Sequence, residues 1–190
     1  MIDPKVELER ARELFHVLMS RRGEADSFRW LVDRYEKKLL YFIRRIVDNS
    51  DRALDVLQEV WLTVFRQIAV LKTPEAFRVW VYRIAHDKAI DQVRGDRRYR
   101  DLAGLSFDDA SCDTSDDSCE GTRLEDAEWI HQLLHELTPA HREVLTLRFL
   151  EEMSLEEIST VLGCSVGTVK SRLHNARRRI QKRILEDKHV

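Results

Sequence analysis

The stretch from Ser165 to Arg183, SVGTVKSRLHNARRRIQKR, carries seven lysines and arginines and no acidic residue. The whole chain has a formal net charge of −2, so positive charge is concentrated in this stretch. A solvated helix face usually mixes both signs in i,i+4 pairs, which are missing here. Because cationic side chains bind DNA phosphates and polar ones read base edges, the composition favours a nucleic-acid-binding helix over an ordinary solvated face.

Helical periodicity divides this stretch into two faces. Successive residues of an α-helix are about 100° apart, so one apolar stripe contains Val166, Val169, Leu173, Ala176, Ile180 and Ile184. The opposite side offers small, polar and basic residues. The side chains that we expect to contact DNA from that side and its flanks are Thr168, Lys170, Ser171, Arg172, His174, Asn175 and Arg178. A major groove accepts a helix of this kind.

A second, shorter helix precedes the basic one. In SLEEISTVLG, Ser154 and Glu157 have the spacing of a capping box, and Gly163 suits the left-handed residue that ends a helix. Ser165 can then cap the basic helix. Two short helices joined by a turn that contains glycine are typical of a helix-turn-helix.

The rest of the chain predicts an all-α protein. Among 190 residues there are 6 glycines and 3 prolines, too few for the turns of a β-protein. Apolar residues recur at helical spacing over residues 28–47, 51–68 and 75–94, with a break at Lys72-Thr73-Pro74 and an end expected at Gly95. Residues 1–22 read as one further amphipathic helix.

An acidic segment divides the chain. From Asp101 to Glu128 there are ten acidic residues against Arg123 alone, without helical periodicity. We therefore expect a flexible acidic linker over residues 100–124. It separates a helical domain over 24–99, preceded by an extension over 1–23, from a helix-turn-helix domain over 125–186.

Two groups of motifs carry a family resemblance. The segment from Leu137 to Ile180 closely resembles the promoter-reading C-terminal domain of bacterial sigma factors of the extracytoplasmic-function (ECF) type, within the sigma-70 family. ALDVLQEVWLTVF resembles that family's core-polymerase-binding helix, with Asp55, Gln58 and Glu59 matching an Asp-x-x-Gln-Glu signature. FRVWVYRIAHDKAIDQVR resembles the helix that opens the −10 promoter element.

The resemblance implies a sigma factor that binds core RNA polymerase and reads the −35 and −10 elements of promoter DNA. Its implied polymerase contacts are the β′ clamp helices, through Asp55, Gln58 and Glu59, and the β flap. The implied −10 contacts are Lys72, Thr73, Phe77, Trp80, Arg83, Lys88, Arg94, Arg97 and Arg98. Control by an anti-sigma factor is also implied.

Three residues depart from the family pattern. His86 and Asp87 stand where Arg and Asn commonly follow Arg-Ile-Ala, which sets a carboxylate beside the DNA backbone. Asn175 stands where Arg is frequent. Because Asn favours adenine and Arg favours guanine, we expect a shifted −35 preference.

The same features leave alternatives open: a sigma-like protein that captures an anti-sigma factor without engaging promoters, or a dimeric helix-turn-helix regulator. The acidic linker either lies in a basic channel of the polymerase, folds over the recognition helix, or acts as a spacer. We expect no enzymatic activity, cofactor or metal site, since His131 and His135 lack further ligands. The absence of a long apolar run and the odd set Cys112, Cys119 and Cys164 predict a cytoplasmic protein with reduced thiols and no membrane insertion.

Overall fold

The computed structural model describes residues 4–47, 49–103 and 137–187, and every regular element in these ranges is helical. The chain divides into two compact units, Met1–Ser106 and Phe107–Val190. The expectation of an all-α protein with two helical parts is therefore confirmed. The predicted acidic linker lies outside the described residues, as do Cys112, Cys119, His131 and His135.

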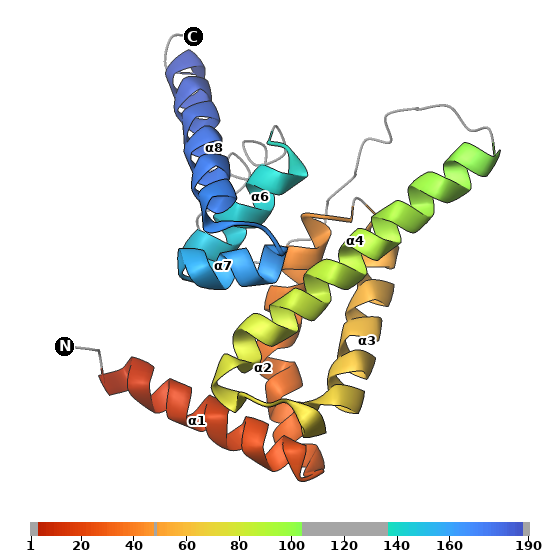
Figure 1. Ribbon diagram of the computed structural model, residues 1–190, viewed down its shortest axis with the longest axis vertical. Coiled ribbons are helices and arrows are strands. Elements are labelled where there is room, and N and C mark those ends of the chain that lie inside the picture. The colour runs from red at the N-terminus through yellow and green to blue at the C-terminus, as the bar shows by residue number, and fades with distance from the viewer. Residues whose placement is uncertain (1–3, 48, 104–136, 188–190) are drawn as a thin grey trace. The chain divides into compact units, whose positions relative to one another are not determined.

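The described part of the first unit contains four α-helices, which run from red to green in Figure 1: α1 (Pro4–Arg21), α2 (Ala25–Arg44), α3 (Ser50–Gln67) and α4 (Phe77–Ala103). Helix α2 packs against each of the other three. Its inward side chains include Leu31, Leu39, Phe42 and Ile43, all at 0% exposure. These residues follow the three- and four-residue spacing that the sequence shows, so the apolar stripe is the core face.

The boundaries of α3 follow from local chemistry. Asn49 has extended backbone angles, and its side chain accepts a hydrogen bond from the Arg52 amide at 3.0 Å, which caps the helix. The helix ends in a 3₁₀ turn, Ile68–Val70, and a second one, Pro74–Ala76, leads into α4. The predicted break at Lys72-Thr73-Pro74 is confirmed.

Helix α4 is longer than the sequence predicts. It continues through Gly95 to Ala103, so the expected end at Gly95 was wrong. A glycine inside a helix costs only about 1 kcal/mol relative to alanine. Side chains around it support the helix: Gln92 donates to Asp96 at 3.1 Å, and Asp96 also pairs with Arg52 of α3.

The second unit holds the elements of the predicted helix-turn-helix. Thr138 occupies the N-cap position of α6 (Pro139–Leu145) with extended backbone angles, and a π-helical turn, Thr146–Leu150, follows the helix. After the bend at Glu152, whose φ is 51°, come α7 (Leu155–Leu162) and α8 (Val166–Asp187), drawn in blue in Figure 1. Their shared core contains Leu147, Met153, Ile158, Val161, Val169 and Ala176, each at 0% exposure.

The described residues contain neither a membrane-crossing helix nor a metal-binding cluster. No helix there has the length and apolar character that crossing a membrane requires. No group of three or more His, Cys, Asp or Glu residues within those ranges is arranged to hold a metal ion.

Candidate nucleic-acid interface

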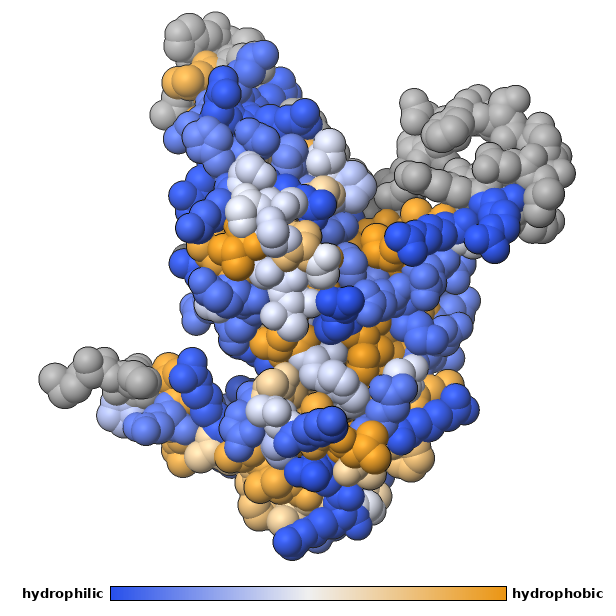
Figure 2. All heavy atoms as spheres, in the orientation of Figure 1, coloured by the Kyte–Doolittle hydropathy of each residue, from blue (hydrophilic) through white to orange (hydrophobic). Residues whose placement is uncertain are grey.

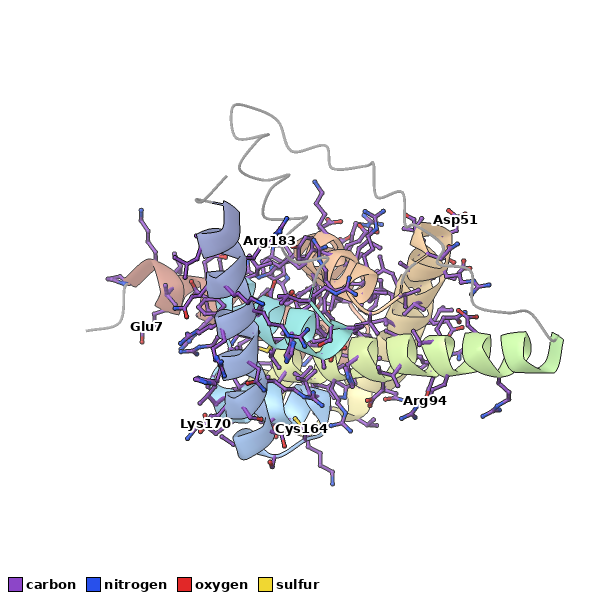
Figure 3. The ribbon with its side chains drawn as sticks, turned by 90° about the horizontal axis from the view of Figure 1, so that it is seen from above. Glu7, Asp51, Arg94, Cys164, Lys170 and Arg183 are labelled. Carbon is purple, nitrogen blue, oxygen red and sulfur yellow. The ribbon has the colours of Figure 1, made fainter. Side chains whose placement is uncertain are left out.

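Helix α8 presents the two faces that its periodicity predicts. Val169, Leu173 and Ala176 are buried, whereas Lys170, Ser171, His174, Asn175 and Arg178 are exposed. Thr168 and Arg172 are half-buried at the flanks. Figure 3 shows Lys170 and Arg183 towards opposite ends of α8, with Cys164 in the turn before it. From Val166 to Leu185 the helix contains no acidic residue, so its outer face is polar and basic throughout.

The turn between α7 and α8 is built from the predicted caps. The Ser154 hydroxyl accepts from the Glu157 amide at 3.1 Å, and the Glu157 carboxylate accepts from the Ser154 amide at 2.7 Å. Gly163 has φ 61° and ψ 34°, a left-handed conformation that costs a glycine little. Ser165 caps α8 by accepting from the Thr168 amide at 3.1 Å. The capping box and both helix ends are therefore confirmed.

Hydroxyl groups at the start of α8 already have partners within the chain. The Thr168 and Ser165 hydroxyls lie 2.9 Å apart, and the Ser171 hydroxyl donates to the Thr168 carbonyl oxygen at 2.9 Å. These bonds hold the first turn in one arrangement. Lys170, His174 and Asn175 extend from the exposed side beside them.

Helix α6 places charge beneath the recognition helix. Glu143 is only 5% exposed, and burial raises the pKa of its carboxyl to about 7, although Arg172 and Arg142 act to lower it. Burial, followed by the charges of Arg179 and Arg172, holds the pKa of His141 below its ordinary value. The back of α8 thus rests on a helix whose titratable groups respond to the arginines of α8.

Helix α3 of the first unit exposes the three residues that match the signature. Asp55, Gln58 and Glu59 are all exposed on one side of the helix. The Glu59 carboxylate lies 3.1 Å from the Lys88 ammonium group of α4. The prediction that they share an exposed face is confirmed, and Glu59 in addition pairs with a predicted DNA contact.

The same side of α3 carries apolar residues that the sequence analysis missed. Leu54, Leu62 and Phe65 are 41%, 54% and 66% exposed, and the Phe65 ring meets Phe28 of α2 edge-on at 5.4 Å. With Gln58 they follow helical spacing along a line beside Asp55 and Glu59. The signal was a second apolar row on α3, outside the row that forms the core.

The predicted −10 residues are spread over α4 and the loop before it. Lys72 and Thr73 are exposed in the loop, Trp80 is half-buried, and Arg94 and Arg98 are exposed on α4, where Figure 3 shows Arg94 pointing outward. The side chain of Arg97 lies outside the described residues. Phe77 is corrected: it is 0% exposed and packs against Tyr35 and Trp80, so it is a core residue and cannot stack on DNA.

The departure at Asp87 has a structural counterpart. The Arg83 guanidinium donates from Nε to the Asp87 carboxylate at 2.9 Å, and His86 Nδ1 lies 3.3 Å from its other oxygen. Two of the predicted DNA-binding cations, Arg83 and Lys88, therefore have carboxylate partners within the chain. In this arrangement Asp87 offsets positive charge on the exposed side of α4.

Comparison with known proteins places both units in one family. Residues 31–99 match the family model for Sigma-70 region 2, and residues 127–180 match the model for Sigma-70 region 4. Together the two matches cover more than half of the chain. The chain therefore belongs to the sigma-70 family of RNA polymerase sigma factors, the transcription initiation factors that work with core polymerase at promoters.

The curated relatives narrow the assignment to the ECF type. The chain is 34% identical to the RNA polymerase sigma-H factor of Pseudomonas aeruginosa, over 85% of this chain and 88% of that protein. It is 30% identical to the ECF RNA polymerase sigma factor SigW of Bacillus subtilis, over 86% and 92% of the two chains.

Two solved structures share the fold. The CnrH structure, in complex with the cytosolic domain of CnrY, has a TM-score of 0.64 at 24% identity and covers 93% of this chain and 99% of its own. The sigma factor RpoE of Bartonella quintana, in complex with the anti-sigma factor NepR, has a TM-score of 0.68 at 21% identity, covering 83% and 96%.

Proposed function

We propose that the second unit reads the −35 element through the outer face of α8. The observation that carries this proposal is the exposed row of Lys170, Ser171, His174 and Asn175 above a buried apolar stripe, on a helix without an acidic residue before Glu186. Residues near the start of such a helix reach base edges, and the later arginines, including Arg178, bind phosphates.

Core polymerase binds the exposed side of α3 in this proposal. Asp55, Gln58 and Glu59 offer carboxylates and an amide to a basic helical partner, which the family resemblance identifies as the β′ clamp helices. Leu54 and Phe65 supply apolar area beside them. A charged rim around exposed apolar residues is typical of a protein-binding surface. The β flap is the proposed partner of the second unit.

Helix α4 and the loop before it act on the −10 element. Lys72 and Thr73 border the loop that receives a flipped base, and Trp80 together with Arg83, Lys88, Arg94 and Arg98 contacts the single strand. Arg97 belongs to this set by its place in the sequence. The protein itself catalyses no reaction and acts in the cytoplasm, because its task is to direct the polymerase.

An anti-sigma factor controls the protein in this proposal. Support comes from the RpoE structure of similar fold, which was solved with an anti-sigma factor bound. The exposed apolar residues of α3 and the basic face of α8 are surfaces that such a partner would need to cover.

The experiment that tests the −35 assignment is footprinting of holoenzyme, reconstituted from core polymerase and this chain, on a selected promoter. Lys170→Ala and His174→Ala should weaken protection of the −35 element by roughly tenfold each, as expected for the loss of a base or phosphate contact worth about 1–3 kcal/mol. The matched control is Gln181→Ala, exposed on the same helix outside the predicted contact set.

Core binding is tested separately by charge reversal. Asp55→Lys and Glu59→Lys should prevent holoenzyme assembly in size-exclusion chromatography, whereas Lys170→Ala should assemble normally. Unchanged −35 protection by Lys170→Ala and His174→Ala holoenzymes would contradict the reading role of α8. Unimpaired assembly of both reversals would contradict the role of α3.

A further inference from the structure

Helix α1 has an inner face that is fixed to the first unit. Val17 is 0% exposed, and His16 stacks on Trp30 of α2 with ring centroids 4.2 Å apart. Arg34 of α2 reaches the Glu9 and Glu13 carboxylates at 2.7 Å and 3.4 Å. Because these contacts fix the helix in rotation, they also determine which side chains face outward.

The outer face of α1 carries a narrow apolar row. Leu8, Phe15 and Leu18 are 61%, 55% and 39% exposed, and Ala11 lies between them, also exposed. The spacing of three, four and three residues keeps all four within about 80° around the helix. Figure 2 shows apolar surface along α1, in the lower left of the view, interrupted by hydrophilic side chains.

This row has the pattern of a helix-packing seam. Two apolar residues per seven, alternating three and four apart, are the a and d positions of a coiled coil. Single exposed apolar residues are ordinary on protein surfaces. A continuous row of them at coiled-coil spacing instead indicates an interaction surface. Helix α1 packs against α2 and the two 3₁₀ turns, yet Leu8, Phe15 and Leu18 of the row stay exposed.

The border of the row is basic. Lys5 and Arg12 are exposed on one side of the row and Arg22 just beyond its end, whereas Glu7 is exposed on the other side. The other acids of the helix, Glu9 and Glu13, contact Arg34 on the inner side, and Glu9 also pairs with Arg12 at 3.5 Å. A partner that covers the row would therefore meet predominantly positive charge.

We propose that the outer face of α1 is a docking site for an acidic amphipathic helix of a partner protein, with aliphatic side chains along its seam and Glu or Asp at its edges. A lipid surface is disfavoured as the partner. Helices that lie on membranes bury a wide apolar face, whereas this row has only two apolar residues per seven. A second copy of α1 is disfavoured, because its basic border would oppose an identical one.

The site is independent of the polymerase and promoter contacts proposed above, which involve α3, α4 and α8. Variants of α1 should therefore leave promoter-directed transcription by purified holoenzyme unchanged. Failure of the α1 proposal and failure of the proposed function are thus distinguished by separate measurements.

The test uses a fluorescein-labelled helical peptide with leucine at the a and d positions and glutamate at the e and g positions, titrated with the full-length chain. Anisotropy should show saturable binding that weakens with added salt. Phe15→Glu should weaken it by roughly tenfold or more, and Phe15→Ala by a smaller factor, as expected for a central aromatic contact. A peptide with lysine at e and g should bind more weakly than the glutamate peptide.

The matched control is Val6→Glu, which adds the same charge to the same helix at a position 45% exposed but off the row. The affinity of this variant for the peptide should stay within about twofold of the wild-type affinity, because surface substitutions away from a contact have small energetic effects. Circular dichroism of each variant checks that the helices are intact.

Several outcomes would overturn the proposal. No saturable binding, equal binding of the lysine peptide, or an equal loss from Val6→Glu would each remove the basis for an acidic helical partner. Self-association in sedimentation equilibrium that Phe15→Glu abolishes would assign the row to a second copy instead. Binding to vesicles of phosphatidylcholine and phosphatidylglycerol, abolished by Phe15→Glu, would assign it to a lipid surface.

Discussion

Asn175 is the residue whose substitution we expect to change the preferred −35 sequence most clearly. It is exposed on α8, on the same side as His174 and Ser171, and no acidic side chain of that helix competes for it before Glu186. An amide that donates and accepts side by side matches the edge of adenine, whereas a guanidinium matches guanine. The identity of one base pair in the −35 element should therefore depend on this side chain.

We predict that Asn175→Arg moves the preferred base at one −35 position from adenine to guanine. Asn175→Ala should flatten the preference there, with a loss of about 1–3 kcal/mol of discrimination. The measurement is selection of holoenzyme-bound promoters from a randomised −35 library. Lys182→Ala is the control, because a phosphate contact should lower affinity for all sequences alike. A preference that survives Asn175→Ala would show that another residue reads this position.

Asp87 is a second residue with a specific consequence. Its carboxylate accepts from Arg83 Nε at 2.9 Å and also lies near His86, on the exposed side of the proposed −10 helix. Removing the charge should release Arg83 towards DNA and remove a repulsion from phosphate. An exposed pair of this kind contributes about 0–1 kcal/mol, so the effect is modest.

We predict that Asp87→Asn tightens holoenzyme binding to the −10 non-template single strand by roughly two- to fivefold, which corresponds to the energy of one exposed ion pair. Fluorescence anisotropy at fixed salt measures it. Asp91→Asn removes the same charge one turn further along α4 and does not touch the Arg83 contact, so it should have a smaller effect. Equal tightening by both variants would mean that net charge alone matters.

At the scale of the elements, α6 packs against α8 and carries an unusual buried carboxyl group. Glu143 is 5% exposed, and burial raises the pKa of its side chain to about 7, against an ordinary value of 4.5. In the folded state this carboxyl therefore keeps its proton to a higher pH than in the unfolded chain. The folded state is favoured below pH 4.5, and that contribution is lost as pH rises to about 7.

We predict that Glu143→Gln removes this pH-dependent loss of folding stability. Relative to wild type, the free energy of unfolding of the variant should rise by on the order of 3 kcal/mol between pH 4.5 and about pH 8. Urea unfolding of the full chain, followed at amide signals of α8, measures it at each pH. Glu156→Gln, exposed on α7, is the control and should show no such rise. A pH-independent difference between Glu143→Gln and wild type would contradict the buried-carboxyl account.

Elements whose ends depend on neighbouring residues could be predicted from the sequence. The capping box at Ser154 and Glu157, the left-handed Gly163 and the cap at Asn49 each involve residues within a few positions of one another. The same local reasoning failed at Gly95, because a propensity cost of about 1 kcal/mol is offset by side-chain contacts of Asp96, one of them with Arg52 of another helix.

Faces that depend on tertiary packing were harder to predict. Phe77 and Trp80 are both aromatic residues near the start of α4, but Tyr35 of α2 packs against Phe77, which is fully buried. Likewise, α3 carries two apolar rows, and the sequence pattern does not say that the row with Leu62 and Phe65 is the one that stays exposed. Which face is covered is decided by the neighbouring helices, and the spacing of residues within one helix contains no information about them.

At the scale of the whole molecule, the two units divide the work. The first unit holds the acidic and apolar side of α3 and the basic side of α4, and the second holds the recognition helix α8. In the proposed function, the main polymerase-binding surface lies on α3, and promoter reading lies on α4 and α8. Variants of α3 should abolish all transcription, whereas variants of α8 should lower it on particular promoters.

Transcription in vitro tests the central claim most directly. Purified chain and core polymerase are incubated with nucleotides and a promoter library randomised over the −35 and −10 elements, and the initiated RNAs are sequenced. We predict initiation from a defined set of promoters, loss of all of it with Asp55→Lys, and an altered −35 consensus with Asn175→Arg. If core polymerase with the wild-type chain neither assembles nor initiates on any template, the account of this protein as a promoter-directing sigma factor is contradicted.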